Sequence, residues 1–481
     1  MTEPIPGKKP GSAMLRRLLW AAVLALNVFR AHAGVIFTNL HSFTGTDDGA
    51  NPYCGLVQGS NGNLYGTASS GGLYNLGTVF KIGGDGALTR LYSFDGTNGA
   101  APYAALVQGR DGRLYGTTYA GGASNLGTIF QFTTNGTLTT LFSFTGADDS
   151  FQGANPGAAL VEAADGSFYG TGEYGGLTNA SYDGQRFAGK GYGTVFQLST
   201  NGTVSAQAVF RNTNGAYPAG GLLLGQDGNF YGTTTWGGKG ITGNLPGYDT
   251  VFRLTPDGKF TNIYSFTGAN DGGFIYAGLV QGRDGYLYGA AFSGGSAYGT
   301  LFKVSTNGSF LPLHTFSYLD SGSPYGGLTE GSDGKFYGTT YGVFAGSGSV
   351  FSVTPDGAFT NLFFFGTTNG SHPVGILVQG PNGNFYGTTS EGGARGLGTV
   401  FQLSVPLPPV IKTLTLTNGT VTLTWSAVAG QTYQAQYSDD LPFTNWSFLT
   451  KPSVASSGVM TATDSDGITS SAHRFYRVVL E

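Results

Sequence analysis

The sequence predicts an all-β protein: a seven-bladed β-propeller closed by its N-terminal strand, followed by a small β-sandwich. Three observations support this prediction. A unit of about 50 residues recurs seven times, which is typical of a radial repeat. Glycine, phenylalanine and tyrosine supply 84, 35 and 27 of the 481 residues while only 10% are charged, which favours turns and strands over helices. Asn-Gly or Asp-Gly pairs separate short apolar runs, as hairpin turns do.

The first element is an export signal over residues 1–33. Two lysines and two arginines precede an apolar run at 18–29, and Ala31-His32-Ala33 is a small-x-small cleavage site. We expect cleavage near Ala33 and a secreted, cell-surface or periplasmic product with no transmembrane helix in the mature chain. The 18 basic and 26 acidic residues that remain give a net charge of −8, which argues against a nucleic-acid partner.

The second element, residues 34–404, is the propeller. One repeat shows the pattern, with expected strands at Ala104–Gln108, Leu114–Thr118, Thr128–Phe132 and Leu138–Phe144. Small residues dominate the first strand and aromatic residues the fourth. Blades crowd at the axis and diverge outward, so this gradient places the first strand innermost.

The last repeat lacks its aromatic fourth strand, because a proline-rich segment follows its Gly-Thr-Val-Phe sequence at 398–401. A matching segment, Val35–Phe43, stands at the start of the mature chain. We therefore expect the N-terminal strand to complete the last blade and close the ring.

The third element is a proline-rich linker at 405–409, and the fourth is a β-sandwich at 410–481. In the fourth, Val421, Leu423 and Trp425 alternate with threonine, which is the period of a half-buried strand. Cys54 is the only cysteine, so no disulfide within the chain is available.

The recurring sequence Tyr-Gly-Thr-Thr-x-x-Gly-Gly followed by Gly-Thr-Val-Phe resembles the GloVer tandem repeat of exported bacterial proteins, over about residues 35–405. The resemblance implies a secreted or surface-displayed propeller-like array and carries no catalytic residues. Repeat six departs from it by lacking the Gly-Gly, and repeat four has Asp249 where the others have glycine. The tail, with Trp425 and Trp446, resembles a fibronectin-type or immunoglobulin-like module.

The candidate site comes from loop lengths. The loop between the second and third strands is enlarged only in repeats three and four, at 177–192 and 239–248. Adjacent blades place these insertions together on one face of the propeller, and loops on a rigid scaffold often carry function. The ligand-binding residues expected there are Tyr119, Glu173, Tyr174, Tyr182, Arg186, Trp236 and Tyr248.

Other chemistries lack a sequence signature. Two GxGxxG matches open no helix, and no zinc-ligand spacing or serine-hydrolase elbow occurs. We expect no cofactor and no metal, with Ca²⁺ at the loop acids (Asp47-Asp48, Asp148-Asp149, Asn270-Asp271) as the alternative. His41 and His314 take the place of aromatic residues in other repeats, which favours a structural role.

Exposed aromatic side chains with scattered polar groups suit a glycan or a protein ligand, including cell-envelope material. We therefore predict a monomeric, non-enzymatic binding scaffold. The alternative is a polysaccharide-active hydrolase or lyase in which Glu173 works with Asp183 or Asp249.

Overall fold

The computed structural model describes residues 34–145, 153–177, 191–238, 248–295, 298–343, 346–405, 409, 411–418, 420–427, 432–439, 446–465 and 474–480. Within these residues the fold is all-β and propeller-like, and its only helical segment is the short 3₁₀ turn η1 (Tyr318–Asp320). The predicted signal peptide lies outside the described residues. None of the described residues forms a helix with the length and hydropathy of a membrane span.

Seven four-stranded antiparallel sheets, numbered here as repeats one to seven, hold most of the described chain. Their strands, in sheet order, are β2 (Val57–Gln58), β3 (Leu64–Ala68), β4 (Thr78–Ile82) and β5 (Leu88–Ser93); β6 (Val107–Gln108), β7 (Leu114–Thr118), β8 (Thr128–Phe132) and β9 (Leu138–Ser143); β10 (Val161–Glu162), β11 (Phe168–Gly172), β12 (Thr194–Leu198) and β13 (Val204–Val209); β14 (Leu223–Leu224), β15 (Phe230–Thr234), β16 (Thr250–Leu254) and β17 (Phe260–Ser265); β18 (Val280–Gln281), β19 (Leu287–Ala291), β20 (Thr300–Val304) and β21 (Phe310–Thr315); β22 (Thr329–Glu330), β23 (Phe336–Thr340), β24 (Ser349–Val353) and β25 (Phe359–Phe364); and β26 (Val378–Gln379), β27 (Phe385–Thr389), β28 (Thr399–Ser404) and β1 (Ile36–Ser42).

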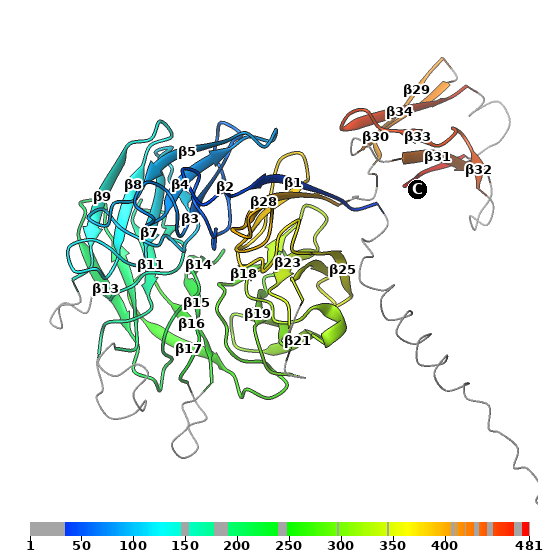
Figure 1. Cartoon of the computed structure of the whole chain (residues 1–481). Helices are drawn as coiled ribbons and strands as arrows, with labels where there is room; N and C mark the ends of the chain where they lie inside the picture. The colour runs from blue at the N-terminus through cyan, green and yellow to red at the C-terminus, as the bar shows by residue number, and fades with distance from the viewer. Residues whose placement is uncertain are drawn as a thin grey trace, which may run out of the picture.

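The first strand of each repeat lies toward the middle of the array and the fourth lies outside, as β14 and β18 against β17 and β21 show in Figure 1. In repeat two, the second and third strands have the bounds expected from the sequence. The first strand is shorter than expected: β6 covers only Val107–Gln108, not Ala104–Gln108. Residues 104 and 105 instead line a cavity, where no further strand lies inside them to pair with.

The Asn-Gly and Asp-Gly turns do more than reverse the chain. In repeat two, Asp111 accepts hydrogen bonds from the Arg113 amide (3.0 Å) and from the hydroxyl of Tyr115 (2.8 Å). In repeat one the direction is reversed, and the Asn61 side-chain amide donates to the hydroxyl of Tyr65 (2.7 Å). The tyrosine ring is thus buried in the core while its polar tip is satisfied, which fixes the register of the hairpin.

The N-terminal strand β1 pairs antiparallel with β28 and is the outer strand of the last sheet, which is the pairing expected from the sequence. Its register runs from Ile36 opposite Ser404 to Ser42 opposite Thr399. Phe37 stacks on Phe363 of the preceding repeat, with ring centroids 4.2 Å apart. Residues about 300–370 apart in the chain therefore share one core.

Neighbouring repeats meet at a glycine and a proline. In six interfaces, a Cβ on the glycine before the third strand would lie 2.5–2.8 Å from the proline Cδ of the next repeat, as Gly193 would from Pro218 and Gly398 from Pro52. A side chain is therefore excluded there. The interface between repeats four and five differs, because Asp249 replaces the glycine and Ile275 replaces the proline. The Ile275 amide, which a proline would lack, donates to the Asp249 carboxylate at 2.7 Å.

Threonines of the second strands add a polar contact between repeats. The Thr117 hydroxyl donates to the Ala158 carbonyl (3.2 Å) and the Thr233 hydroxyl to the Ala277 carbonyl (2.9 Å). Thr388 of the last repeat makes the equivalent bond to Cys54 of the first (2.6 Å). The first and last repeats thus meet through the same contacts as repeats adjacent in sequence.

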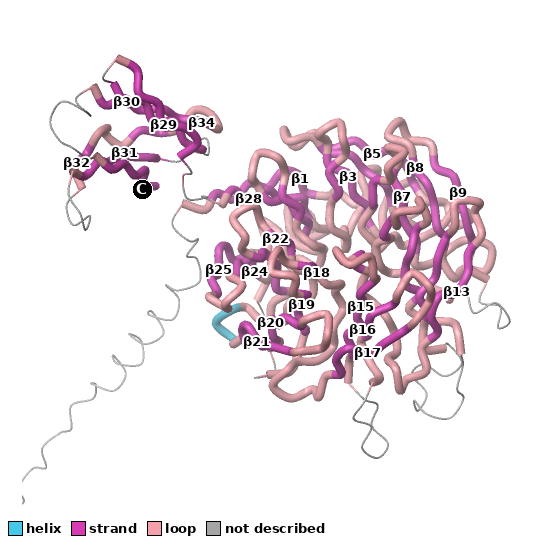
Figure 2. The backbone as a smooth tube through the Cα atoms, turned by 180° about the vertical axis from the view of Figure 1, so that it is seen from behind, coloured by secondary structure: helices cyan, strands magenta, loops and turns pink. Residues whose placement is uncertain are grey.

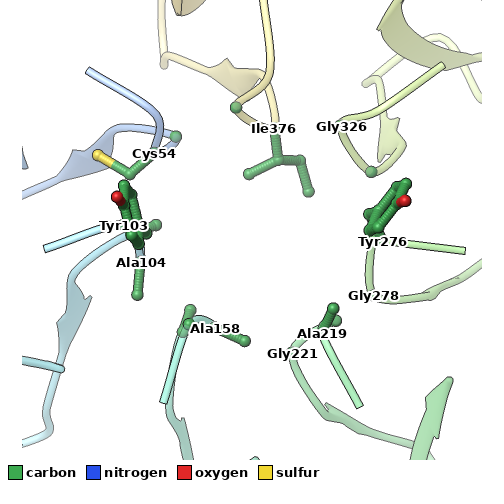
Figure 3. A pocket seen from close by; sticks show the side chains of 18 of the residues that line it. Cys54, Tyr103, Ala104, Ala158, Ala219, Gly221, Tyr276, Gly278, Gly326 and Ile376 are labelled. Atoms are coloured by element: carbon green, nitrogen blue, oxygen red, sulfur yellow. The ribbon is translucent and has the colours of Figure 1, made fainter. Parts of the chain in front are cut away.

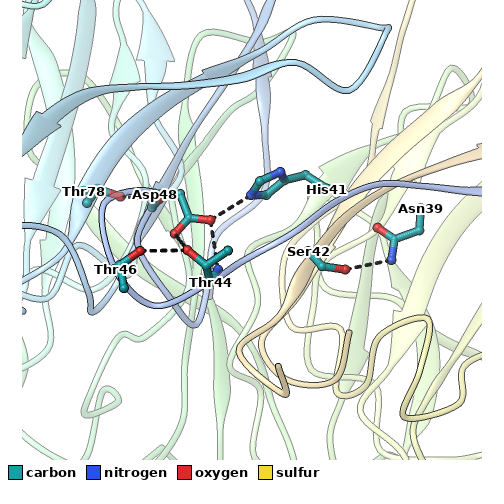
Figure 4. A network of polar contacts seen from close by, with 7 residues as sticks. All are labelled: Asn39, His41, Ser42, Thr44, Thr46, Asp48 and Thr78. Atoms are coloured by element: carbon teal, nitrogen blue, oxygen red, sulfur yellow. Dashed lines mark hydrogen bonds and ion pairs between the residues drawn. The ribbon is translucent and has the colours of Figure 1, made fainter. Parts of the chain in front are cut away.

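The predicted structural role of His41 is consistent with its contacts (Figure 4). Its Nε2 lies 3.0 Å from Asp48, which also accepts hydrogen bonds from the Thr44 amide (2.9 Å) and hydroxyl (2.6 Å). These bonds lower the pKa of Asp48, although burial alone would raise it. Asp271 accepts the same pair of bonds from Thr267. Both acids therefore hold their own loops together.

Two further sheets follow residue 410 (Figure 2). One contains β29 (Ile411–Thr417), β30 (Thr420–Ser426) and β34 (Val459–Asp464), and in the other β31 (Thr432–Ser438) pairs with β32 (Ser447–Phe448), β33 (Ser453–Val454) and β35 (Phe475–Leu480). Trp425 and Leu423 from the first sheet share a buried cluster with Tyr433 and Ala435 from the second. This is the packing of a two-sheet module.

Candidate functional site

A cavity of about 610 Å³ lies where the seven repeats meet. Each repeat contributes three or four consecutive residues from the segment before its first strand, so the lining repeats around the opening (Figure 3). The wall is made of small residues because the backbones approach closely. A Cβ on Gly220 would lie 2.6 Å from the Ala277 carbonyl oxygen, and one on Gly375 would lie 2.5 Å from the Cys54 carbonyl oxygen. The small first-strand residues in the sequence are a consequence of this crowding.

Tyrosines surround the mouth of this cavity. We call Tyr53, Tyr103, Tyr119, Tyr276 and Tyr325, all of which line it, the aromatic belt. Figure 3 shows Tyr103 and Tyr276 on opposite sides of the opening. Tyr53 and Tyr103 are 37% and 38% exposed, so their ring surfaces are accessible to a ligand.

The aromatic belt has two arcs. In the first, the Tyr103 ring lies edge-on to both Tyr53 (5.4 Å) and Tyr119 (5.3 Å). In the second, Tyr276 stacks on Tyr325, with centroids 4.8 Å apart and planes inclined by 12°. Each ring is held by its neighbour, so little side-chain entropy remains to be lost when a ligand binds.

Glu173 lies in the gap between the two arcs. It directly follows β11 and lines the cavity together with Tyr119. Burial raises the pKa of Tyr119 far above its usual value, and the Glu173 charge and hydrogen bonds to Glu173 and Tyr174 raise it further. The pKa of Tyr325 is raised to about 12, by burial first, then by Tyr276 and Glu173. The negative charge of Glu173 therefore acts on both arcs of the aromatic belt.

Of the other expected site residues, Tyr174, Trp236 and Tyr248 are described, and the rest lie outside the described residues. The Tyr174 ring contacts Tyr217 (5.7 Å), and Trp236 lies edge-on to Phe274 (4.9 Å). Tyr248 is 41% exposed and packs over Gly268 of the following connector. None of these three belongs to the cavity lining. Tyr182, Arg186 and most of both predicted insertions lie outside the described residues.

Sequence reasoning missed four members of the aromatic belt: Tyr53, Tyr103, Tyr276 and Tyr325. A signal was present, because three of them follow a proline directly, as in Asn51-Pro52-Tyr53. In every repeat, the residue two positions before the belt position has a positive φ, including Tyr217 (54°) and Phe274 (56°). This turn aims the next side chains at the axis, a consequence that the sequence pattern alone does not reveal.

Carboxylates other than Glu173 have different surroundings. Asp249 is 1% exposed, and burial raises its pKa well above the usual value. It lies in the interface with Ile275 and is not part of the cavity lining. His372 lies 3.1 Å from Glu391, and its ring is 4.4 Å from Tyr341. Within the described ranges, no group of three or more His, Cys, Asp or Glu side chains is placed to hold a metal ion.

The chain was compared with known proteins. It is similar to a gluconolactonase from Xanthomonas campestris (13% identity, 79% of this chain and 93% of that one, TM-score 0.41). It is also similar to a luciferin-regenerating enzyme (12%, 77% and 96%, 0.40) and to a family 43 arabinoxylan arabinofuranohydrolase from Bacillus subtilis (15%, 92% and 98%, 0.33). All three likenesses are distant, and no curated protein matches the chain.

The match to a sequence family is much more extensive. The profile of the Gloeobacter/Verrucomicrobia repeat matches residues 27–245 and again residues 242–438. These two matches cover the seven four-stranded sheets and the cavity between them. The chain therefore belongs to the Gloeobacter/Verrucomicrobia repeat family.

Proposed function

We propose that this protein is an exported binding scaffold that holds a glycan at the mouth of the central cavity, between the two arcs of the aromatic belt. The single observation that carries the proposal is the belt itself: five tyrosines from four different repeats converge on one opening of a 610 Å³ cavity. Rigid aromatic faces with a few polar groups are suited to stacking on sugar rings, and this volume is that of an ordinary small-ligand site.

The scaffold we infer is a closed seven-bladed propeller. Thr388 bonds to Cys54, and Gly398 packs on Pro52, as equivalent residues do between repeats adjacent in sequence. Ring closure by β1 would fix the spacing of the belt tyrosines, because these tyrosines stand on four different repeats. We further propose that export follows cleavage near Ala33 and that the fibronectin-type or immunoglobulin-like C-terminal module serves as a spacer or an attachment unit.

Binding fits the lining better than hydrolysis does. Glycosidic hydrolysis normally uses two carboxyl groups on opposite sides of the scissile bond. Among the described lining residues, Glu173 is the one carboxylate. Asp249, the described partner considered for it, is buried in an interface between repeats.

A glycan array followed by calorimetry on the mature chain, residues 34–481, tests the proposal. We expect a glycan ligand whose affinity falls about three- to tenfold in Tyr103→Ala, since one aromatic contact is lost. Tyr74→Ala is the matched control, because Tyr74 is 60% exposed and does not line the cavity. Absence of binding across the array, or an equal loss in both variants, would contradict the proposal.

A further inference from the structure

A row of aromatic rings leads from the cavity mouth across repeats five to seven. It starts at Tyr276 and Tyr325, the stacked pair of the aromatic belt, whose ring centroids are 4.8 Å apart. The Tyr341 ring follows Tyr325 at 6.2 Å, and the His372 ring follows Tyr341 at 4.4 Å. Neither Tyr341 nor His372 is among the described residues that line the cavity, so the row continues beyond it. We call these four rings the ring track.

An ionisable pair stands at the outer end of the ring track. His372 Nδ1 lies 3.1 Å from a carboxylate oxygen of Glu391. The two side chains are 25% and 48% exposed, so both are accessible to a ligand. Burial first, and then the Glu391 charge, raise the pKa of Tyr341, while the pKa of Tyr53 is raised by burial, then by Tyr341 and by Glu391. The pair therefore lies within electrostatic reach of the cavity mouth.

The backbone holds this pair in place. Ser371 and Glu391 form an isolated antiparallel bridge, with N···O distances of 2.8 and 3.1 Å. The His372 amide donates to the Ser347 carbonyl (2.9 Å), and the Ser390 hydroxyl donates to the His372 carbonyl (2.9 Å). A ligand that binds here meets groups that are already in position, which lowers the entropy cost of binding.

The fold does not require an imidazole and a carboxylate at these two positions. The equivalent residues are Ala101 and Ala120 in repeat two, and Ser323 and Gly342 in repeat six. The positive φ of His372 (55°) recurs in every repeat and is adopted by alanine in repeat two (49°). The His-Glu pair is therefore a feature of repeat seven alone, which favours a role in binding over a role in folding.

The ring track and the ionisable pair offer the two kinds of contact that a sugar chain uses. Ring surfaces pack against the apolar faces of sugars, and tyrosine hydroxyl groups donate and accept hydrogen bonds. A carboxylate accepts hydrogen bonds from sugar hydroxyl groups, and such charge-assisted bonds are stronger than neutral ones. A ligand that contacts the whole row spans four consecutive rings, which exceeds a single sugar.

Building on the proposed function, we propose that the glycan is a chain of several sugars, and that it runs from the cavity mouth along the ring track to a subsite formed by Tyr341, His372 and Glu391. The Glu391 carboxylate accepts hydrogen bonds from sugar hydroxyl groups, and His372 orients the carboxylate through their 3.1 Å contact. The tyrosines of the ring track supply packing surface between the mouth and this subsite. No bond is made or broken.

Calorimetry on the mature chain with ligands of different length tests this inference. The probes are cellobiose and cellohexaose, the dimer and hexamer of N-acetylglucosamine, laminaribiose and laminarihexaose, and the dimer and hexamer of the strongest array ligand. We expect the hexamer of at least one series to bind about tenfold more tightly than its dimer. Glu391→Ser and His372→Asn should each reduce this gain to about twofold, because the outer subsite loses its carboxylate or the group that orients it.

The two variants use residues that the fold already carries. Serine stands at the Glu391 position in repeats one and five, and asparagine stands at the His372 position in repeats one and three. Asp257→Asn is the matched control, because it removes a carboxylate from the turn between β16 and β17, outside the ring track, and should leave the gain with length in place. Thermal melting at the wild-type temperature would show that a lost gain is not a loss of folding.

The outcomes separate the two proposals. Dimers that bind as tightly as hexamers in every series, or a gain with length that survives Glu391→Ser, would overturn the ring-track inference and leave glycan binding at the mouth in place. Failure of every probe and of the wider glycan array would overturn the proposed function itself.

Discussion

The interface between repeats four and five offers a strong test of how the repeats pack. Ile275→Pro would restore the proline found in the other six interfaces, but opposite an aspartate instead of a glycine. The substitution removes the amide that donates to Asp249 at 2.7 Å. Leaving this buried acceptor without its donor costs about 1–3 kcal/mol. The proline Cδ would also crowd the Asp249 Cβ, and such overpacking costs about 1–3 kcal/mol.

We therefore expect Ile275→Pro to lower the free energy of unfolding by about 3–5 kcal/mol. Adding Asp249→Gly removes both problems, because glycine has no Cβ and no carboxylate to satisfy. The double variant should return to within about 1 kcal/mol of the wild type, allowing for the backbone entropy of the new glycine. The mirror-image change Gly193→Asp, opposite Pro218, should be destabilising for the same steric reason.

Urea unfolding followed by tryptophan fluorescence measures these differences, provided that the slope with urea is the same for each variant. The reasoning requires a favourable coupling between the two substitutions of at least about 2 kcal/mol. If the double variant loses the sum of the two single losses, the pairing of Gly with Pro and of Asp with Ile is coincidental.

Three further predictions concern stability. Because burial raises the pKa of Asp249, the folded protein retains a proton that the unfolded chain releases. The contribution of Asp249 to the free energy of unfolding is therefore fully present below about pH 3.8 and is lost as pH rises through the folded pKa. Asp249→Asn should remove that fall, and urea titrations showing the same fall in both proteins would contradict this prediction. Thr388→Val deletes the bond to Cys54 and should cost about 0.5–1.5 kcal/mol in the same assay, and no change would show that this contact does not stabilise the fold. Phe37→Ala removes the half-buried ring stacked on Phe363 and should lower the free energy of unfolding by about 2–3 kcal/mol in the same assay. An unchanged free energy of unfolding would contradict this prediction.

The sequence predicts the hairpins of each repeat well and the arrangement around the central cavity poorly. The bounds of β7 agree with the expected strand because Asp111 sets both the turn and, through Tyr115, the register, and all three features are local in the chain. The pairing of β1 with β28 was also predictable, because a missing aromatic strand at one end matched a surplus strand at the other. The short length of β6 was not predictable, because it depends on there being no further strand on the cavity side for residues 104 and 105 to pair with.

Some residues of the candidate site were likewise expected from the sequence and others were not. Tyr119 and Glu173 were expected from their place beside the insertions, and both line the cavity. Tyr53 and Tyr276 were not, although their repeating position was visible, because their meeting depends on segments more than 200 residues apart converging on one opening. The repeat, its turns and its aromatic cores are predictable from the sequence, since they follow from residues close along the chain. Which side chains face the central cavity is not, because that direction is set by backbone crowding among seven repeats at once.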